Sequence, residues 1–161
     1  MAITKILYRN GGLRQAIDYI TNPAKTNEQL LTDYVRCDPG YAAQQMMDTK
    51  RALGKIAGRQ CYHIIQSFKP DEITPELAHE IAKQFAAEHL PGYEAVIATH
   101  VDKAHIHSHI VFNSVNAVTG KMYHSTRENY YKQIRGVSDR LCKAHGLSIV
   151  LENGEKKAVS Y

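Results

Sequence analysis

Four histidines stand close together in the second half of the chain, at His100, His105, His107 and His109. Side chains alternate between the two faces of a β-strand, so the last three would point the same way. The isoleucines and the phenylalanine of this stretch would point to the opposite, core-packed face. The spacing therefore predicts histidines on the uncovered face of a sheet, where imidazoles can gather around a metal ion.

The predicted metal ligands are His100, His107 and His109. A tight reversal after His100 would bring it beside the other two, which lie two residues apart on one strand. Three neutral imidazoles leave coordination positions open, as a catalytic metal needs. Metal-bound imidazoles usually hydrogen-bond through their other nitrogen, and Asp102 is the candidate partner. Asn113 shares the predicted face and could bond the metal shell or the DNA, or only satisfy a sheet edge. The alternatives are a solvent-facing histidine cluster and a structural zinc site, for which the sequence positions no fourth ligand.

A tyrosine on a predicted helix is the next candidate. Leu13, Ala16, Ile17 and Ile20 follow helical spacing, and Tyr19 lies at the edge of the stripe that they form. Its ring could rest on the sheet and present the hydroxyl to a site. Position alone also fits an ordinary boundary tyrosine.

Two segments resemble motifs of the relaxase/mobilisation nucleases, the MobA/MobL-type relaxases of the HUH endonuclease superfamily. Residues 16–26 (AIDYITNPAKT) are similar to their tyrosine motif, and residues 100–113 (HVDKAHIHSHIVFN) to their three-histidine motif. Residues 62–68 (YHIIQSF) resemble the strand before the family's Glu-rich helix. The resemblance runs from about residue 8 to residue 116, and more loosely to residue 146. Ser108 departs from the pattern, because a bulky hydrophobe usually separates the paired histidines.

This resemblance implies nicking and rejoining of one DNA strand at an origin of transfer, which starts conjugative transfer or mobilisation. Tyr19 matches the nucleophile, and the three histidines match the metal ligands. Attack by Tyr19 on the scissile phosphate would give a 5′-phosphotyrosyl link and a free 3′-OH, so rejoining needs no nucleotide cofactor. A divalent cation, Mg²⁺ or Mn²⁺, would neutralise the developing charge. The expected partners are single-stranded origin DNA and relaxosome accessory proteins.

Other residues are candidates for supporting roles. A tyrosine with a pKa of about 10 is a weak nucleophile at neutral pH, and His63 and His105 are the candidate bases or proton relays. Tyr123 and Tyr130 could stack on bases. The predicted DNA-binding residues are basic side chains of the loops and the open face: Lys25, Lys103, Lys121 and Arg127.

The elements expected around these residues alternate strands with helices. The expected order is β-α-β-α-β-α-β-β-α, with the clearest strands at 93–100 and 106–116 and a last short strand at 147–151. The reversal at 102–105 is too short for a parallel crossover, so the two clear strands must be antiparallel. These features predict an α+β fold, a mainly antiparallel sheet with helices packed on one face and the metal site on the other.

Length and composition fit a single domain over residues 1–161. Chains of the resembled family usually continue further, so we expect this chain to be a truncated N-terminal catalytic part. The net charge of +4 favours polyanions weakly. Three dispersed cysteines indicate a reduced, cytoplasmic protein, and no apolar run reaches the roughly 18 residues of a membrane span.

Other functions remain open at this point. A rolling-circle replication initiator or a single-tyrosine transposase also pairs histidines with a tyrosine, but usually places the tyrosine after them, whereas Tyr19 comes first. A non-catalytic single-stranded nucleic-acid binder and a metal hydrolase of small phosphoesters are the remaining alternatives.

Overall fold

The computed structural model describes residues 2–27 and 30–149. Five strands form one sheet in the order β1-β3-β5-β4-β2, and every neighbouring pair is antiparallel. The strands are β1 (Ala2–Arg9), β2 (Thr32–Val35), β3 (Cys61–Phe68), β4 (Ala95–His100) and β5 (His107–Asn113). The predicted α+β fold and antiparallel sheet are therefore confirmed.

The helices connect the strands in the predicted order. They are α1 (Leu13–Ile20), α2 (Ala42–Leu53), α3 (Pro75–His89), α4 (Arg127–Asn129), the π-helix η1 (Tyr130–Arg135) and α5 (Gly136–Ala144). Within the described residues, no helix is long and apolar enough to cross a membrane. Residues 147–149 do not form the expected last strand, and the rest of that segment lies outside the described residues.

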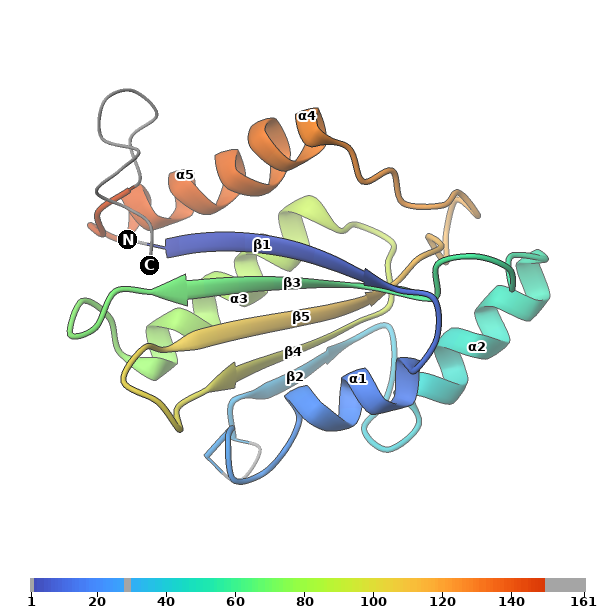
Figure 1. Ribbon diagram of the computed structural model, residues 1–161, viewed down its shortest axis with the longest axis horizontal. Helices are drawn as coiled ribbons and strands as arrows, with labels where there is room; N and C mark the ends of the chain where they lie inside the picture. The colour runs from blue at the N-terminus through green and yellow to red at the C-terminus, as the bar shows by residue number, and fades with distance from the viewer. Residues whose placement is uncertain (1, 28–29, 150–161) are drawn as a thin grey trace.

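Helices cover both faces of the sheet, which corrects the prediction of a single covered face. The larger core joins α3, η1 and α5 to inward side chains such as Ile64, Ile110 and Phe112. A second core joins α1 and α2 to Val96, Ala98 and Val111 on the histidine face. Figure 1 shows α3 behind the sheet, α5 along β1, and α1 on the side that faces the viewer. Helical periodicity shows that a helix has an apolar stripe, but not which face of a sheet the stripe covers.

The histidine face stays open towards β1. Leu7 pairs with His63 across β1 and β3, so both side chains lie on this face. Leu7 is 51% exposed, because α1 packs against β4 and β5 and leaves the part of this face beside β1 uncovered. The uncovered part of the histidine face is therefore a strip beside β1.

Helix α2 ends at a glycine. Its last residue is Leu53, and Gly54 follows in the left-handed conformation with φ 68°. Glycine adopts this conformation without a steric penalty, which explains why the helix stops here. The inner face of α2 also buries Lys50, beside Ala42 and Met46.

Candidate active site

Antiparallel pairing of β4 with β5 gathers three histidines at one end of the sheet. His100 and His107 are register partners, and His109 pairs with Ala98 one step along the same face. The ring centroids of His100 and His109 are 4.0 Å apart, and those of His107 and His109 are 6.3 Å apart. His100 and His109 are buried, and His107 is half-buried. The structure thus brings the three predicted ligands together.

Hydrogen bonds fix which nitrogens of these rings are free to bind a ligand. His100 Nε2 lies 2.9 Å from the carbonyl oxygen of Ile20. A carbonyl only accepts, so Nε2 carries the proton and Nδ1 keeps its lone pair in the neutral ring. His109 Nδ1 lies 2.7 Å from His63 Nε2, whereas His109 Nε2 is buried with no hydrogen-bond partner in the described structure. A buried nitrogen without a partner is costly, and a metal ion would satisfy it.

Burial keeps these rings neutral, which is the form that binds metals. It lowers the pKa of His63 to about 4 and that of His109 to about 2, with a smaller contribution from neighbouring cationic and imidazole groups. Burial also lowers the pKa of His100 and His107. Desolvation disfavours the charged imidazolium, so all four rings hold lone pairs at neutral pH.

The donor set therefore fits a divalent cation in its chemistry. As the side chains lie, no three histidine, cysteine or carboxylate groups of the described residues converge closely enough to hold an ion. Within the described residues, His109 Nε2 nevertheless lacks a partner and the His100 ring lies beside it. Small ring rotations, which leave the strands in place, change how closely the imidazole nitrogens approach one another.

Tyr19 lies directly beside this cluster. Its ring centroid is 5.7 Å from that of His100 and 6.1 Å from that of His109, in edge-on contacts. The stripe formed by Leu13, Ala16, Ile17 and Ile20 is buried. This packing leaves Tyr19 at the rim of the helix, 52% exposed. The phenol is therefore accessible to a ligand and adjacent to two candidate metal ligands.

Asp102 pairs with Lys25 instead of with a histidine. The Lys25 ammonium is 3.0 Å from Asp102 Oδ2 and 5.6 Å from the centre of the Tyr19 ring. The hydrogen bond with Lys25 lowers the pKa of Asp102, and the same bond raises the pKa of Lys25. The Ile20 carbonyl and His63 bond the second nitrogens of His100 and His109, so the role of Asp102 as the partner of a metal-bound imidazole stays a prediction.

Of two further predicted residues, Asn113 lies away from this cluster and His105 lies at its edge, beside His107. Asn113 is buried, and its amide donates to the Met46 carbonyl and to Glu94 Oε1 at the other end of β5. His105 precedes the first residue of β5, so strand alternation does not govern it; its ring centroid is 6.3 Å from that of His107.

The predicted DNA-binding residues do not form one patch. Lys25 is beside Tyr19, and Lys103 follows Asp102 in the β4–β5 loop. Lys121 follows the far end of β5, and Arg127 begins α4, where its guanidinium lies 5.9 Å from the Tyr131 ring.

The proposed stacking tyrosines serve the protein interior instead. Tyr123 hydroxyl bonds His89 and Asn129, and Tyr130 hydroxyl donates to the Thr4 carbonyl. Both rings also pack against the larger core. Their prediction as base-stacking residues is therefore not supported by the positions that they occupy.

Sequence reasoning missed two contributors to the cluster. The Ile20 carbonyl orients His100, but a backbone group leaves no trace in residue type. Strand β1 supplies Leu7 beside His63, together with Arg9, whose charge contributes to the lowered pKa of His63. The alternation within residues 2–9 could have placed Leu7 and Arg9 on one face, but their neighbour across the sheet depends on register.

Comparisons with known proteins agree with the resemblance seen in the sequence. A family model for the nuclease domain of MobA/VirD2-like relaxases matches residues 19–147. Protein rlx of Staphylococcus aureus is 36% identical over 149 residues, which is 92% of this chain and 45% of that protein. The group II intron-interrupted relaxase LtrB of Lactococcus lactis is 32% identical and covers 92% of this chain and 33% of that protein. The chain thus spans less than half the length of these relatives.

Solved structures share the fold at low sequence identity. The MobM relaxase domain, solved with bound plasmid pMV158 oriT DNA and Mn, has a TM-score of 0.68 at 18% identity. The match covers 99% of this chain and 94% of that one. A structure from work on vancomycin resistance transfer in Staphylococcus aureus has a TM-score of 0.59 at 13% identity, covering 92% and 95% of the two chains. Together with the family model and the relatives above 30% identity, these findings show that the chain belongs to the relaxase family, as a MobA/VirD2-like nuclease domain.

Proposed function

We propose that this chain nicks and rejoins one strand of DNA at an origin of transfer through a covalent 5′-phosphotyrosyl intermediate. The observation that carries the proposal is the contact of the exposed Tyr19 ring with His100 and His109. Relatives named as relaxases and the oriT DNA bound by MobM support the choice of substrate. Single-stranded origin DNA is the proposed partner, with accessory proteins at the same origin, and the cytoplasm is the proposed place of action.

His100, His107 and His109 are the proposed ligands of a divalent cation, Mg²⁺ or Mn²⁺. When bound, such an ion neutralises charge on the scissile phosphate. The chain contributes the orientation of two of the rings. The Ile20 carbonyl leaves Nδ1 of His100 free, and a bond from His109 Nδ1–H to His63 leaves Nε2 of His109 free. In this arrangement, the proposed role of His63 is to orient the His109 ring, and not to act as a base for Tyr19.

The covalent step exchanges one phosphoester for another. The Tyr19 oxygen forms a bond to phosphorus and loses its proton, while the bond from phosphorus to the 3′ oxygen breaks and that oxygen gains a proton. Lys25, 5.6 Å from the Tyr19 ring, can stabilise negative charge on the phenolate or the phosphate. His105 remains the proposed proton acceptor, since its ring lies beside the candidate ligand His107.

An adduct assay tests this function. The chain is incubated with Mn²⁺ and single-stranded oligonucleotides that tile the origin region of its own genetic element, and products are separated on a denaturing gel. We expect a covalent protein–DNA band that disappears with EDTA and in Tyr19→Phe. Tyr8→Phe is the matched control, because Tyr8 is also 52% exposed but lies on β1. Cleavage without an adduct would support a hydrolase, and binding without cleavage would support a passive module.

A further inference from the structure

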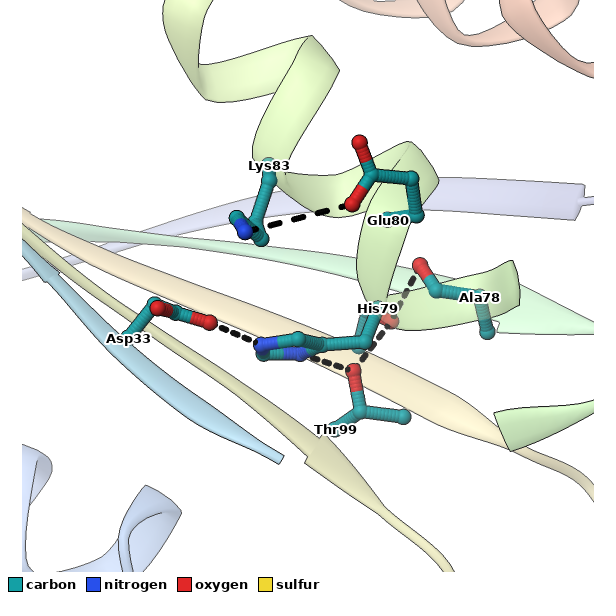
Figure 2. Close-up of polar contacts among 7 residues, drawn as sticks. Asp33, Ala78, His79, Glu80, Lys83 and Thr99 are labelled. Carbon is teal, nitrogen blue, oxygen red and sulfur yellow. Dashed lines mark hydrogen bonds and ion pairs between the residues drawn. The ribbon is translucent and has the colours of Figure 1, made fainter. Parts of the chain in front are cut away.

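A second polar cluster lies behind the histidines, on the opposite face of the same two strands. Figure 2 shows His79 of α3 between Asp33 of β2 and Thr99 of β4. Thr99 in turn contacts Ser108 of β5 with 2.9 Å between the hydroxyl oxygens. His79, Thr99 and Ser108 are all buried, with Thr99 and Ser108 at 0% exposure. The cluster therefore joins one helix to three strands, through buried side chains on α3, β4 and β5 and the partly exposed Asp33 on β2.

Counting protons gives the direction of this chain of hydrogen bonds. Ser108 donates its one hydroxyl proton to the Ala78 carbonyl at 3.3 Å, so it accepts from Thr99. Thr99 has then used its own proton, so it accepts from His79 Nδ1–H at 2.9 Å. His79 Nε2–H donates to Asp33 Oδ2 at 2.6 Å. The His79 ring therefore links the Asp33 carboxylate to the Thr99 hydroxyl.

The position of this cluster in the register connects it to the candidate metal ligands. Thr99 and Ser108 form the cross-strand pair between the His100–His107 pair and the Ala98–His109 pair. Each ligand is therefore bonded through the backbone to Thr99 or Ser108. Ser108 is the residue that departs from the hydrophobe usual between paired histidines. Its hydroxyl partners on β4 and α3 explain how a polar residue is accommodated there.

We propose that His79 is a positioning residue for metal binding. Held by Asp33, it anchors Thr99 and Ser108 and so fixes β4 against β5 at the step that carries His100, His107 and His109. A shift of strand backbone at this step would separate the imidazoles, whose nitrogens must meet at one point to share an ion. This inference rests on the proposed function only in taking these three histidines as ligands.

Metal affinity of the EDTA-stripped chain tests the inference without any DNA. Isothermal titration with Mn²⁺ is carried out on the wild type, His79→Ala and Thr99→Val, at a temperature where circular dichroism shows each chain folded. We expect the dissociation constant to rise on the order of 10-fold in both variants, as for other residues that orient metal ligands. Thr99→Val keeps the side-chain shape and removes only the hydroxyl, so it remains informative if His79→Ala does not fold.

Ile81→Val is the matched control. Ile81 is fully buried on α3, two residues after His79, and belongs to the apolar core. The Ile81→Val substitution should lower thermal stability and leave Mn²⁺ affinity unchanged. Faster amide hydrogen exchange at 98–100 and 107–109 in metal-free His79→Ala, but not in Ile81→Val, is the second expected result.

The outcomes separate this inference from the proposed function. Wild-type affinity in both network variants would overturn the positioning role alone. An equal loss of affinity in Ile81→Val would also overturn it, because general loosening of α3 would then suffice. If the wild type binds no Mn²⁺, or binds it as well after His109→Ala, the proposed metal site fails and the positioning role fails with it.

Discussion

Acid should destabilise the metal-free chain through its buried histidines, and His63 gives the clearest measure of this effect. Burial lowers the pKa of His63 from 6.5 to about 4 in the folded chain. Between these values the unfolded chain binds a proton that the folded chain excludes. The stability contributed by neutral His63 is therefore complete above about pH 6.5 and falls as the pH drops towards about 4. From about pH 7.5 to about pH 5, this linkage costs about 2 kcal/mol in the free energy of unfolding.

Urea unfolding in EDTA at these two pH values measures the loss. We expect His63→Gln to show a loss about 2 kcal/mol smaller than the wild type, because glutamine keeps an amide near His109 but does not titrate. His109, whose pKa burial also lowers, contributes its own loss to both proteins. His124→Gln is the control, since His124 is an exposed histidine. Equal acid losses in wild type and His63→Gln would refute the reasoning, because burial of His63 would then not exclude its proton.

Three other changes separate the roles of neighbouring residues. His109→Ala should abolish detectable Mn²⁺ binding in a titration, because it removes the buried Nε2 that lacks a partner. Lys25→Ala should weaken binding of single-stranded DNA and reduce its salt slope by about 1, while leaving the free energy of unfolding nearly unchanged, as its ion pair is near the surface. Asn113→Ala should cost about 1–3 kcal/mol in urea unfolding, through lost bonds to Met46 and Glu94, with unchanged Mn²⁺ affinity. A lower Mn²⁺ affinity in Asn113→Ala would restore its predicted place near the metal.

Patterns along single elements predicted much of the fold and the composition of the site. The two-residue period of 107–113 placed His107 and His109 on one face and Ile110 on the other, as the structure shows. The short reversal after His100 forced antiparallel pairing, which sets His100 opposite His107. The apolar stripe of the first helix left Tyr19 at its edge, where it is half-exposed. Each of these inferences needs only local periodicity and a loop length.

Pairings between distant elements were beyond such reasoning. Lys25 meets Asp102 across 77 positions of sequence, and His63 meets His109 across 46. Nothing in either local pattern distinguishes these partners from other charged or polar residues. Lys50 shows the same limit within a helix, because its position on the inner face of α2 is polar in sequence yet fully buried beside Ser114. Burial lowers the pKa of Lys50 to about 8, which is the physical cost of that exception.

The first helix and the histidine cluster are joined by one hydrogen bond that serves both. Ile20 is the last residue of α1, so no later turn of the helix supplies an N–H donor for its carbonyl. By accepting from His100 Nε2, this carbonyl satisfies the helix end and also selects the ring form of His100 that leaves Nδ1 free. Tyr19 immediately precedes Ile20, so the same contact holds the phenol beside the cluster. The proposed nucleophile Tyr19, which precedes the proposed metal ligands in sequence, is therefore placed by the end of its own helix. Its distance from His100 depends on a backbone group that side-chain substitution leaves in place.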